Sequence, residues 1–134
     1  MQRYMLDTNT VSHIIKAHPQ VIQRLVALPI PSLCISAITE GERFGLAKRP
    51  EARRLHQAVH ELLMRVDVLP WDRKTAETYG RIRAQLEQQG IILAALDLLI
   101  ATHALHASAV LVTSGRAFFQ LTELQTQDWT HPTG

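Results

Sequence analysis

The segment from Tyr4 to Thr10 reads YMLDTNT. Its apolar start, Tyr4-Met5-Leu6, is typical of a short buried β-strand, and Asp7 follows this strand directly. A polar side chain at that point lies at the carboxyl edge of a sheet, where open α/β folds bind their ligands. We therefore expect an α/β domain whose functional site begins at Asp7.

Short apolar runs alternate with longer helical patterns along the rest of the chain. The expected strands are residues 3–6, 33–36, 66–69 and 110–113, with a weaker fifth near 123–126. The expected helices are residues 12–18, 19–28, a segment from Ser36 or Thr39 to Lys48, a segment from Pro50, residues 72–89 between Asp72 and Gly90, and 96–106. This alternation predicts three layers, with helices on both faces of a mostly parallel central sheet of four to five strands.

The composition fits one globular domain over residues 1–134, with 46% hydrophobic and 19% charged residues. The single cysteine, Cys34, lies within an apolar run, which favours a core position in a reducing compartment and excludes a zinc-finger spacing. The first residues do not resemble a signal peptide, and no apolar run reaches membrane-spanning length. We therefore expect a cytoplasmic protein that has no membrane partner.

Basic residues gather between positions 43 and 54, although the formal net charge of the chain is only +2. The cluster consists of Arg43, Lys48, Arg49, Arg53 and Arg54, with Glu51 as the one acid among them. Such a cluster suits a nucleic-acid phosphate backbone. A solvated helix face explains it equally well, so both interpretations stay open.

Two later acids, Glu42 and Asp97, each follow an apolar stretch by a few residues, as Asp7 does. Three carboxylates at one sheet edge repel each other unless a cation neutralises them. Oxygen ligands with room for water favour Mg²⁺, with Mn²⁺ as a substitute. The sequence therefore predicts a metal-dependent enzyme acting on phosphates. Helix capping is the alternative role for Asp97, and a solvent-facing side chain is the alternative for Glu42.

Thr39 and Glu42 are three positions apart and share one face of the expected helix, whereas Glu40 points away toward Arg43. Asn9 is placed to orient a metal-bound water or a carboxylate, or else to cap the helix that follows it. Glu42 is therefore the expected third acid of the site, with Asn9 and Thr39 in supporting positions.

Taken together, the motifs resemble those of PIN-domain ribonucleases, specifically the VapC-type toxins of bacterial VapBC toxin–antitoxin pairs. The resemblance covers essentially the whole chain and rests on the order and spacing of MLDTN (5–9), ISAITEGE (35–42) with Gly45, YGRIRA (79–84), LDLLIA (96–101), VLVT (110–113) and Asp128-Trp129. It implies that Asp7, Glu42 and Asp97 are catalytic and that Asp7 and Asp97 hold Mg²⁺. The implied activity is an endoribonuclease that cuts structured RNA, in this subgroup often the anticodon stem-loop of initiator tRNA, and thereby arrests translation.

The resemblance also implies two protein partners. One is a VapB-type antitoxin that covers the metal site, and the other is a second copy of the chain in a homodimer. Apolar residues near positions 14–15, 21–25 and 44–46 are candidates to receive the antitoxin, with ordinary core packing as the alternative.

The chain departs from the family pattern after its fourth expected strand. PIN domains usually carry a fourth Asp or Asn there, whereas this chain reads Thr113-Ser114-Gly115-Arg116. Thr113 and Ser114 are left as supporting hydroxyl groups, Arg116 becomes a further candidate contact for RNA phosphate, and a second metal site stays open.

Before Asp97 the chain reads GIILAA where related chains tend to have Pro and Gly, so Asp97 is expected inside a helix that begins earlier.

Two other functions stay open at this point. The same metal site fits an enzyme that cuts DNA or ribosomal RNA, because phosphate contacts carry no sequence information. The missing fourth acid instead favours a degraded PIN fold that binds RNA or a partner protein without cleaving anything.

Overall fold

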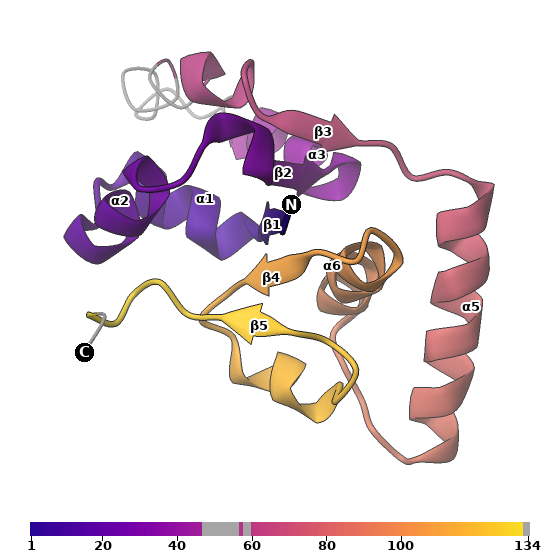
Figure 1. Ribbon diagram of the computed structural model, residues 1–134. Helices are drawn as coiled ribbons and strands as arrows, with labels where there is room; N and C mark the ends of the chain where they lie inside the picture. Colours follow the sequence, from indigo (N-terminus) through magenta and orange to yellow (C-terminus); the bar gives the residue numbers. More distant parts are fainter. Residues whose placement is uncertain (47–56, 58–59, 133–134) are drawn as a thin grey trace.

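The computed structural model describes residues 1–46, 57 and 60–132. Strands and helices alternate through this part of the chain, as expected (Figure 1). The elements, with η for a short 3-10 helix, are β1 (Tyr4–Leu6), α1 (Thr8–Ile15), α2 (Pro19–Val26), η1 (Ile30–Ser32), β2 (Leu33–Ser36), α3 (Ala37–Leu46), β3 (Asp67–Leu69), α5 (Arg73–Gln88), α6 (Ala95–His106), β4 (Val110–Val112), η3 (Arg116–Gln120) and β5 (Thr126–Gln127). Among the helices described, none is both long and apolar enough to cross a membrane.

Five strands form one sheet in the order β3-β2-β1-β4-β5, and every neighbouring pair is parallel. The central strand is β1, whose Met5 is in register with Cys34 on β2 and with Leu111 on β4. Because these strands are parallel, the segments that follow them all start at the same edge of the sheet. The expected parallel sheet is therefore confirmed, and its carboxyl edge gathers residues that are distant in sequence.

The sheet separates two hydrophobic cores, because successive strand residues point to opposite faces. Met5 belongs to the core that contains Ile82 of α5 and Ala101 of α6. Leu6, one position later, belongs to the core that contains Val11 of α1 and the residues of α2. In Figure 1, α5 and α6 accordingly lie on one side of β1, with α1 and α2 on the other. The expected three-layer arrangement is confirmed.

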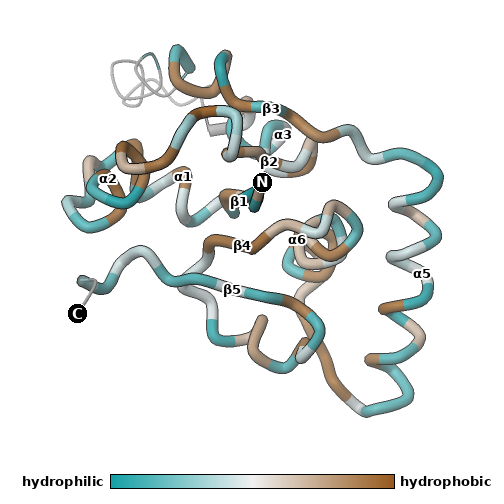
Figure 2. Tube along the Cα trace, viewed as in Figure 1, coloured by the Kyte–Doolittle hydropathy of each residue, from teal (hydrophilic) through white to brown (hydrophobic). Residues whose placement is uncertain are grey.

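Helix α5 has the ends that the sequence predicts. The Asp72 carboxylate accepts hydrogen bonds from the backbone N–H of Thr75 at 2.9 Å and from its hydroxyl at 2.8 Å. Just beyond the helix, Gly90 has a φ of 70°, which glycine adopts without strain. Ile82 and Leu86, one turn apart, are buried, while most of the helix is hydrophilic (Figure 2).

The structure corrects the bounds of the first helix. The helix expected over residues 12–18 begins at Thr8 and ends at Ile15. Asp7 is its N-cap, since the carboxylate Oδ1 accepts a hydrogen bond from the backbone N–H of Thr10 at 2.7 Å. Apolar periodicity starts only at Val11, whereas the capping side chain fixes where the helix begins. The capping role considered for Asn9 therefore belongs to Asp7.

Three other expected elements have different bounds or lie partly outside the described residues. The weak fifth strand lies at Thr126–Gln127 instead of 123–126, where it pairs with β4. The helix expected to run to Lys48 is α3, which is described only as far as Leu46. The start of the helix expected from Pro50 lies outside the described residues, although residues 60–63 are helical.

Candidate active site

A cavity of about 150 Å³ is lined mainly by residues at the carboxyl edge of the sheet. Three separate helices contribute its polar side chains, which are Asp7, Thr8 and Asn9 at the start of α1, Glu42 on α3 and Asp97 on α6. Apolar side chains complete the lining, namely Leu96, Ile100 and Phe118. The fold thus brings the three expected acids to one cavity.

Asp7 is held rigidly between β1 and α1, and it is buried, with 4% of its surface exposed. Its backbone N–H donates to the carbonyl of Val112 at 3.2 Å, while its carboxylate caps α1. Burial raises the pKa of the Asp7 carboxyl group, and the nearby charge of Asp97 adds to that increase. Hydrogen bonds with Thr113 and with the backbone N–H of Thr10 act against it. A cation in the cavity would relieve this accumulated negative charge.

Asp97 is the third residue of α6, which begins at Ala95, so the expectation that it lies inside an earlier helix is confirmed. The N-cap residue is Ala94, which offers no side-chain cap. Asp97 is therefore not the capping residue, although a negative charge in the first turn is favoured by the helix dipole. Its position in the cavity lining leaves the carboxylate available to a ligand.

Glu42 lines the same cavity but is held by a hydroxyl group from another helix. The Thr8 Oγ1 atom donates a hydrogen bond to Glu42 Oε1 at 2.8 Å. No pattern in the sequence indicates that Thr8 faces a residue 34 positions away, so its role is visible only in the folded chain. This contact depends on how α1 and α3 are packed.

Glu40 makes a different interaction, and the expectation that it faces Arg43 is confirmed. The Arg43 guanidinium donates to Glu40 Oε1 at 2.6 Å and to Oε2 at 3.3 Å. The same group lies over the ring of Phe44, with Cζ 4.4 Å from the ring centroid. Only 4% of Arg43 is exposed, so this cation is committed to the fold around α3 instead of being free on the surface for RNA.

The supporting residues differ in their surroundings. Asn9 is exposed at the rim of the cavity. Thr39 is buried, and its hydroxyl has no hydrogen-bond partner within the described residues. The Thr113 hydroxyl accepts a hydrogen bond from the backbone N–H of Gly115 at 3.0 Å. Ser114 is exposed and outside the cavity lining, so its expected contact with a metal or water stays a prediction.

The remaining candidate RNA contacts fall into two groups. Arg116 is exposed in η3, the same short helix that sends Phe118 into the cavity lining. The other four candidates lie outside the described residues, namely Lys48, Arg49, Arg53 and Arg54. Arg116 thus lies on an element that borders the acid cavity.

The helical faces considered for an antitoxin are mostly part of the core. Ile14, Val21 and Leu25 are buried in the layer between the sheet and the two N-terminal helices. Core packing, the alternative named above, is therefore correct for these residues. Phe44 differs, because half of its side chain remains exposed.

The donor set fits a hard divalent cation. Within the described residues, no three acidic, histidine or cysteine side chains lie close enough to share one metal ion. Asp97 is close enough for its charge to raise the pKa of Asp7, and both residues offer oxygen atoms to the cavity. Mg²⁺ typically takes one or two carboxylates and keeps several waters, so this pair fits Mg²⁺, whereas the structure does not bring Glu42 into a common ligand set.

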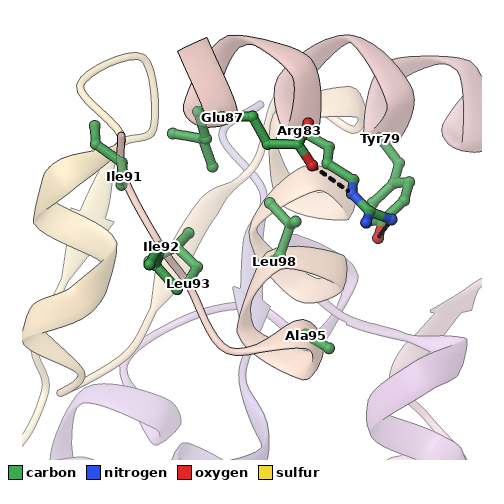
Figure 3. Close-up of a pocket in the computed structure, with 9 residues that line it drawn as sticks. Tyr79, Arg83, Glu87, Ile91, Ile92, Leu93, Ala95 and Leu98 are labelled. Atoms are coloured by element: carbon green, nitrogen blue, oxygen red, sulfur yellow. Dashed lines mark hydrogen bonds and ion pairs between the residues drawn. The ribbon is translucent and has the colours of Figure 1, made fainter. Parts of the chain in front are cut away.

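A second cavity, of about 300 Å³, lies between α5, α6 and the segment that joins them (Figure 3). Its lining is largely apolar and includes Ile91 and Leu98. The one carboxylate in it, Glu87, is paired with Arg83 at 3.1 Å. This cavity therefore lacks free acidic groups, and the smaller acid-lined cavity is the candidate active site.

The fold and the site define an α/β domain with paired acids at the carboxyl edge of a parallel sheet. The PIN domain family model matches residues 4–124. The chain is 33% identical over 131 residues to the ribonuclease VapC2 of Haemophilus influenzae, covering 96% of this chain and 99% of that protein. It is 34% identical over 131 residues to the tRNA(fMet)-specific endonuclease VapC of Shigella flexneri, with the same coverage of both chains.

Solved structures agree with these matches. The crystal structure of DNA-bound VapBC from Salmonella typhimurium contains a chain that matches this one with a TM-score of 0.85 and 34% identity, covering 96% of this chain and 99% of that chain. The chain therefore belongs to the PIN domain family and, within it, to the VapC group of toxin–antitoxin ribonucleases, as its motifs imply.

Proposed function

We propose that this chain is a Mg²⁺-dependent endoribonuclease and the toxin of a type II toxin–antitoxin pair. Its substrate is structured RNA, specifically initiator tRNA in the anticodon stem-loop, and its cleavage arrests translation in the cytoplasm. The observation that carries the proposal is the cavity that Asp7, Glu42 and Asp97 line at the carboxyl edge of a PIN-type sheet. The name of the Shigella flexneri relative, a tRNA(fMet)-specific endonuclease, supports the choice of substrate.

In this proposal Asp7 and Asp97 hold the ion, and Glu42 adds negative charge beside it. When bound, Mg²⁺ supplies a water of lowered pKa and neutralises the scissile phosphate. Asp7 is fixed before any ligand arrives, because its carboxylate is tied to the first turn of α1. The buried side chains of Ile100 and Phe118 form an apolar part of the cavity wall, which strengthens the electrostatic interactions inside the cavity. The products are a 5′-phosphate and a 3′-hydroxyl.

RNA binding needs positive charge around this acidic cavity. Arg116 is exposed on η3, and Lys48, Arg49, Arg53 and Arg54 belong to the basic cluster noted in the sequence. Phosphate contacts of this kind place a substrate without reading its bases. We therefore assign Arg116 and the basic cluster to backbone binding, and leave Arg43 out of this set because it is paired with Glu40.

Two protein partners belong to the proposal. One is a cognate VapB-type antitoxin, supported by the VapBC complex of Salmonella typhimurium among the structural matches. The second partner is another copy of the chain in a homodimer. Among the side chains that the structure describes on α1, α2 and α3, Phe44 and Val26 are large apolar groups that are exposed, by 50% and 74%, and so are available for such contacts.

A second candidate function is binding without cleavage, by a degraded PIN domain. The observation that favours it is the sequence after β4, where Ser114 and Gly115 stand in place of a fourth acid or amide. Ser114 is exposed and lies outside the cavity lining. This candidate predicts that the chain binds RNA or a partner protein equally well with and without its three acids.

Induced expression in bacteria separates the two functions. The wild-type chain should arrest growth, and Asp7→Ala should not. A matched control is Asp67→Ala, which removes an exposed carboxylate paired with Arg3, the residue just before β1, and this variant should still arrest growth. Purified protein should cleave initiator tRNA in the presence of Mg²⁺, and the cleavage should stop when EDTA is added. Elongator tRNA, ribosomal RNA and single-stranded DNA should stay intact. Growth arrest by Asp7→Ala, or no cleavage of any RNA by the wild type, would favour binding without cleavage.

A further inference from the structure

The hydrogen bond between Thr8 and Glu42 joins two helices across the acid cavity. Thr8 is the first residue of α1 and Glu42 lies on α3, and both side chains are half-buried in the cavity lining. The donor is the Thr8 Oγ1 atom and the acceptor is Glu42 Oε1, 2.8 Å apart. A carboxylate has four lone-pair positions, so this bond leaves Oε2 free to act on a ligand.

Thr8 is rigidly placed, so the bond fixes Glu42 more than it fixes Thr8. The turn that contains Thr8 is tied to β4 on both sides, because the N–H of Asp7 and the hydroxyl of Thr10 both donate to the carbonyl of Val112, at 3.2 and 2.8 Å. Threonine also has few side-chain rotamers in a helix, whereas glutamate is long and flexible. The hydroxyl therefore selects one orientation of the glutamate.

The neighbours of Glu42 leave its charge available. Arg43 comes next in the chain, but its guanidinium is engaged by Glu40 at 2.6 Å. The partner that the structure shows for Glu42 is a neutral hydroxyl. Thr8 thus orients this carboxylate without cancelling its charge, which is what a cation in the cavity requires.

We propose that Thr8 is a positioning residue, whose hydroxyl holds the Glu42 carboxylate in the orientation that accepts hydrogen bonds from the waters of a cation held by Asp7 and Asp97. The proposal rests on the proposed metal-dependent function and adds a residue to it. Residues that orient ligands in this way typically change metal affinity by about 10- to 100-fold when they are lost. A purely structural tie between α1 and α3 predicts lower stability without a specific change in metal affinity.

The test uses Mn²⁺ as the probe, titrated into the purified chain by calorimetry. Thr8→Val keeps the shape of the side chain and removes the donor, so it should weaken Mn²⁺ binding by about 10-fold. Thr8→Ser keeps the hydroxyl and should bind nearly as the wild type does. Thr78→Val removes a hydroxyl on α5 that bonds to Lys74 and lies outside the cavity, so it should leave Mn²⁺ affinity unchanged.

A second measurement detects the hydrogen bond itself without metal. In EDTA, Thr8→Val should lower the Tm of the wild-type chain but leave the Tm of Glu42→Ala unchanged, because the acceptor is already gone. Equal Mn²⁺ affinity in Thr8→Val and the wild type, or equal weakening in Thr8→Ser and Thr8→Val, would overturn the positioning role alone. A wild-type chain that binds no Mn²⁺ would instead refute the metal-dependent function and, with it, this role.

Discussion

The Nδ1 atom of His103 lies 2.6 Å from the Oγ atom of Ser36, so a buried hydrogen bond joins α6 to the end of β2. The Ser36 oxygen also accepts a hydrogen bond from the backbone N–H of Ile38 at 3.1 Å, at the start of α3. The imidazole is enclosed further by the Trp71 ring, whose centroid is 5.4 Å away. His103 therefore supports the start of the helix that carries Glu42, which agrees with a packed histidine and not with a catalyst.

This histidine predicts a pH dependence of stability. Burial lowers the pKa of His103, with a smaller contribution from His106. The pKa of this histidine in the unfolded chain is about 6.5. Below that pH the unfolded chain binds more protons than the folded chain, and this lowers the free energy of unfolding. Stability should therefore fall as the pH drops from about 6.5 through the lowered pKa.

His103→Asn should flatten this part of the curve, measured as Tm between pH 5 and 7.5, roughly the range in which histidine titrates. His131→Gln is the control, because that side chain is exposed and the slope should survive its loss. An unchanged slope in His103→Asn would show that another group titrates.

Asp7→Asn should abolish RNA cleavage while the fold remains intact. The amide has the shape of the carboxylate and leaves no cavity, but it lacks the charge that a cation needs. Cleavage should fall by more than about 100-fold, beyond the effect typical of residues that only orient a ligand. Because burial and Asp97 both disfavour the charged Asp7 carboxylate, the Tm in EDTA should stay the same or rise. Full activity in this variant, measured at saturating Mg²⁺, would contradict the assignment.

Substitution of Glu42 should impair RNA cleavage, whereas substitution of Glu40 should lower stability. Glu42→Gln should reduce cleavage at saturating Mg²⁺ by about 10-fold or more, because the charge beside the cation is lost. Glu40→Gln should instead lower the Tm, because it leaves the buried Arg43 guanidinium with a weaker partner. If Glu40→Gln proves more damaging to cleavage, the assignment of the third acid is wrong.

Neutralising Arg49, Arg53 and Arg54 together should weaken RNA binding and reduce its dependence on salt. Each lost phosphate contact should lower the slope of log affinity against log salt by about one. The matched control is Arg83→Gln, which removes a cation paired with Glu87 on α5. A salt slope equal to that of the wild type would assign the three arginines to a solvated face or to the antitoxin.

The free protein should bind one Mg²⁺ ion. Asp7 and Asp97 suffice for one ion, Ser114 and Gly115 supply no fourth carboxylate, and the exposed Arg116 on η3 opposes a second positive charge. Calorimetric titration without RNA should fit one site, and RNA phosphate should be needed before a second ion enters. Two sites of similar affinity in the free protein would show that another group completes the cluster.

Local sequence patterns determined the order of the elements, the parallel sheet and most of the acid site. Apolar runs such as Tyr4-Met5-Leu6 and the signals around Asp72 and Gly90 act through short-range physics, namely burial, capping and backbone freedom. The same patterns placed Asp7 at the end of such a run, which is the carboxyl edge of β1. Asp97 follows no strand, because α6 comes directly after α5, and it reaches the cavity through the position of α6.

Tertiary structure alone decided which side chains meet there. The contact from Thr8 to Glu42 depends on the packing of α1 against α3. Arg43 can be buried because its guanidinium is paired with the Glu40 carboxylate. The 2.6 Å contact between His103 and Ser36 likewise joins residues 67 positions apart. Such contacts leave no periodic signal in a sequence, because they are set by how whole elements pack and not by local spacing.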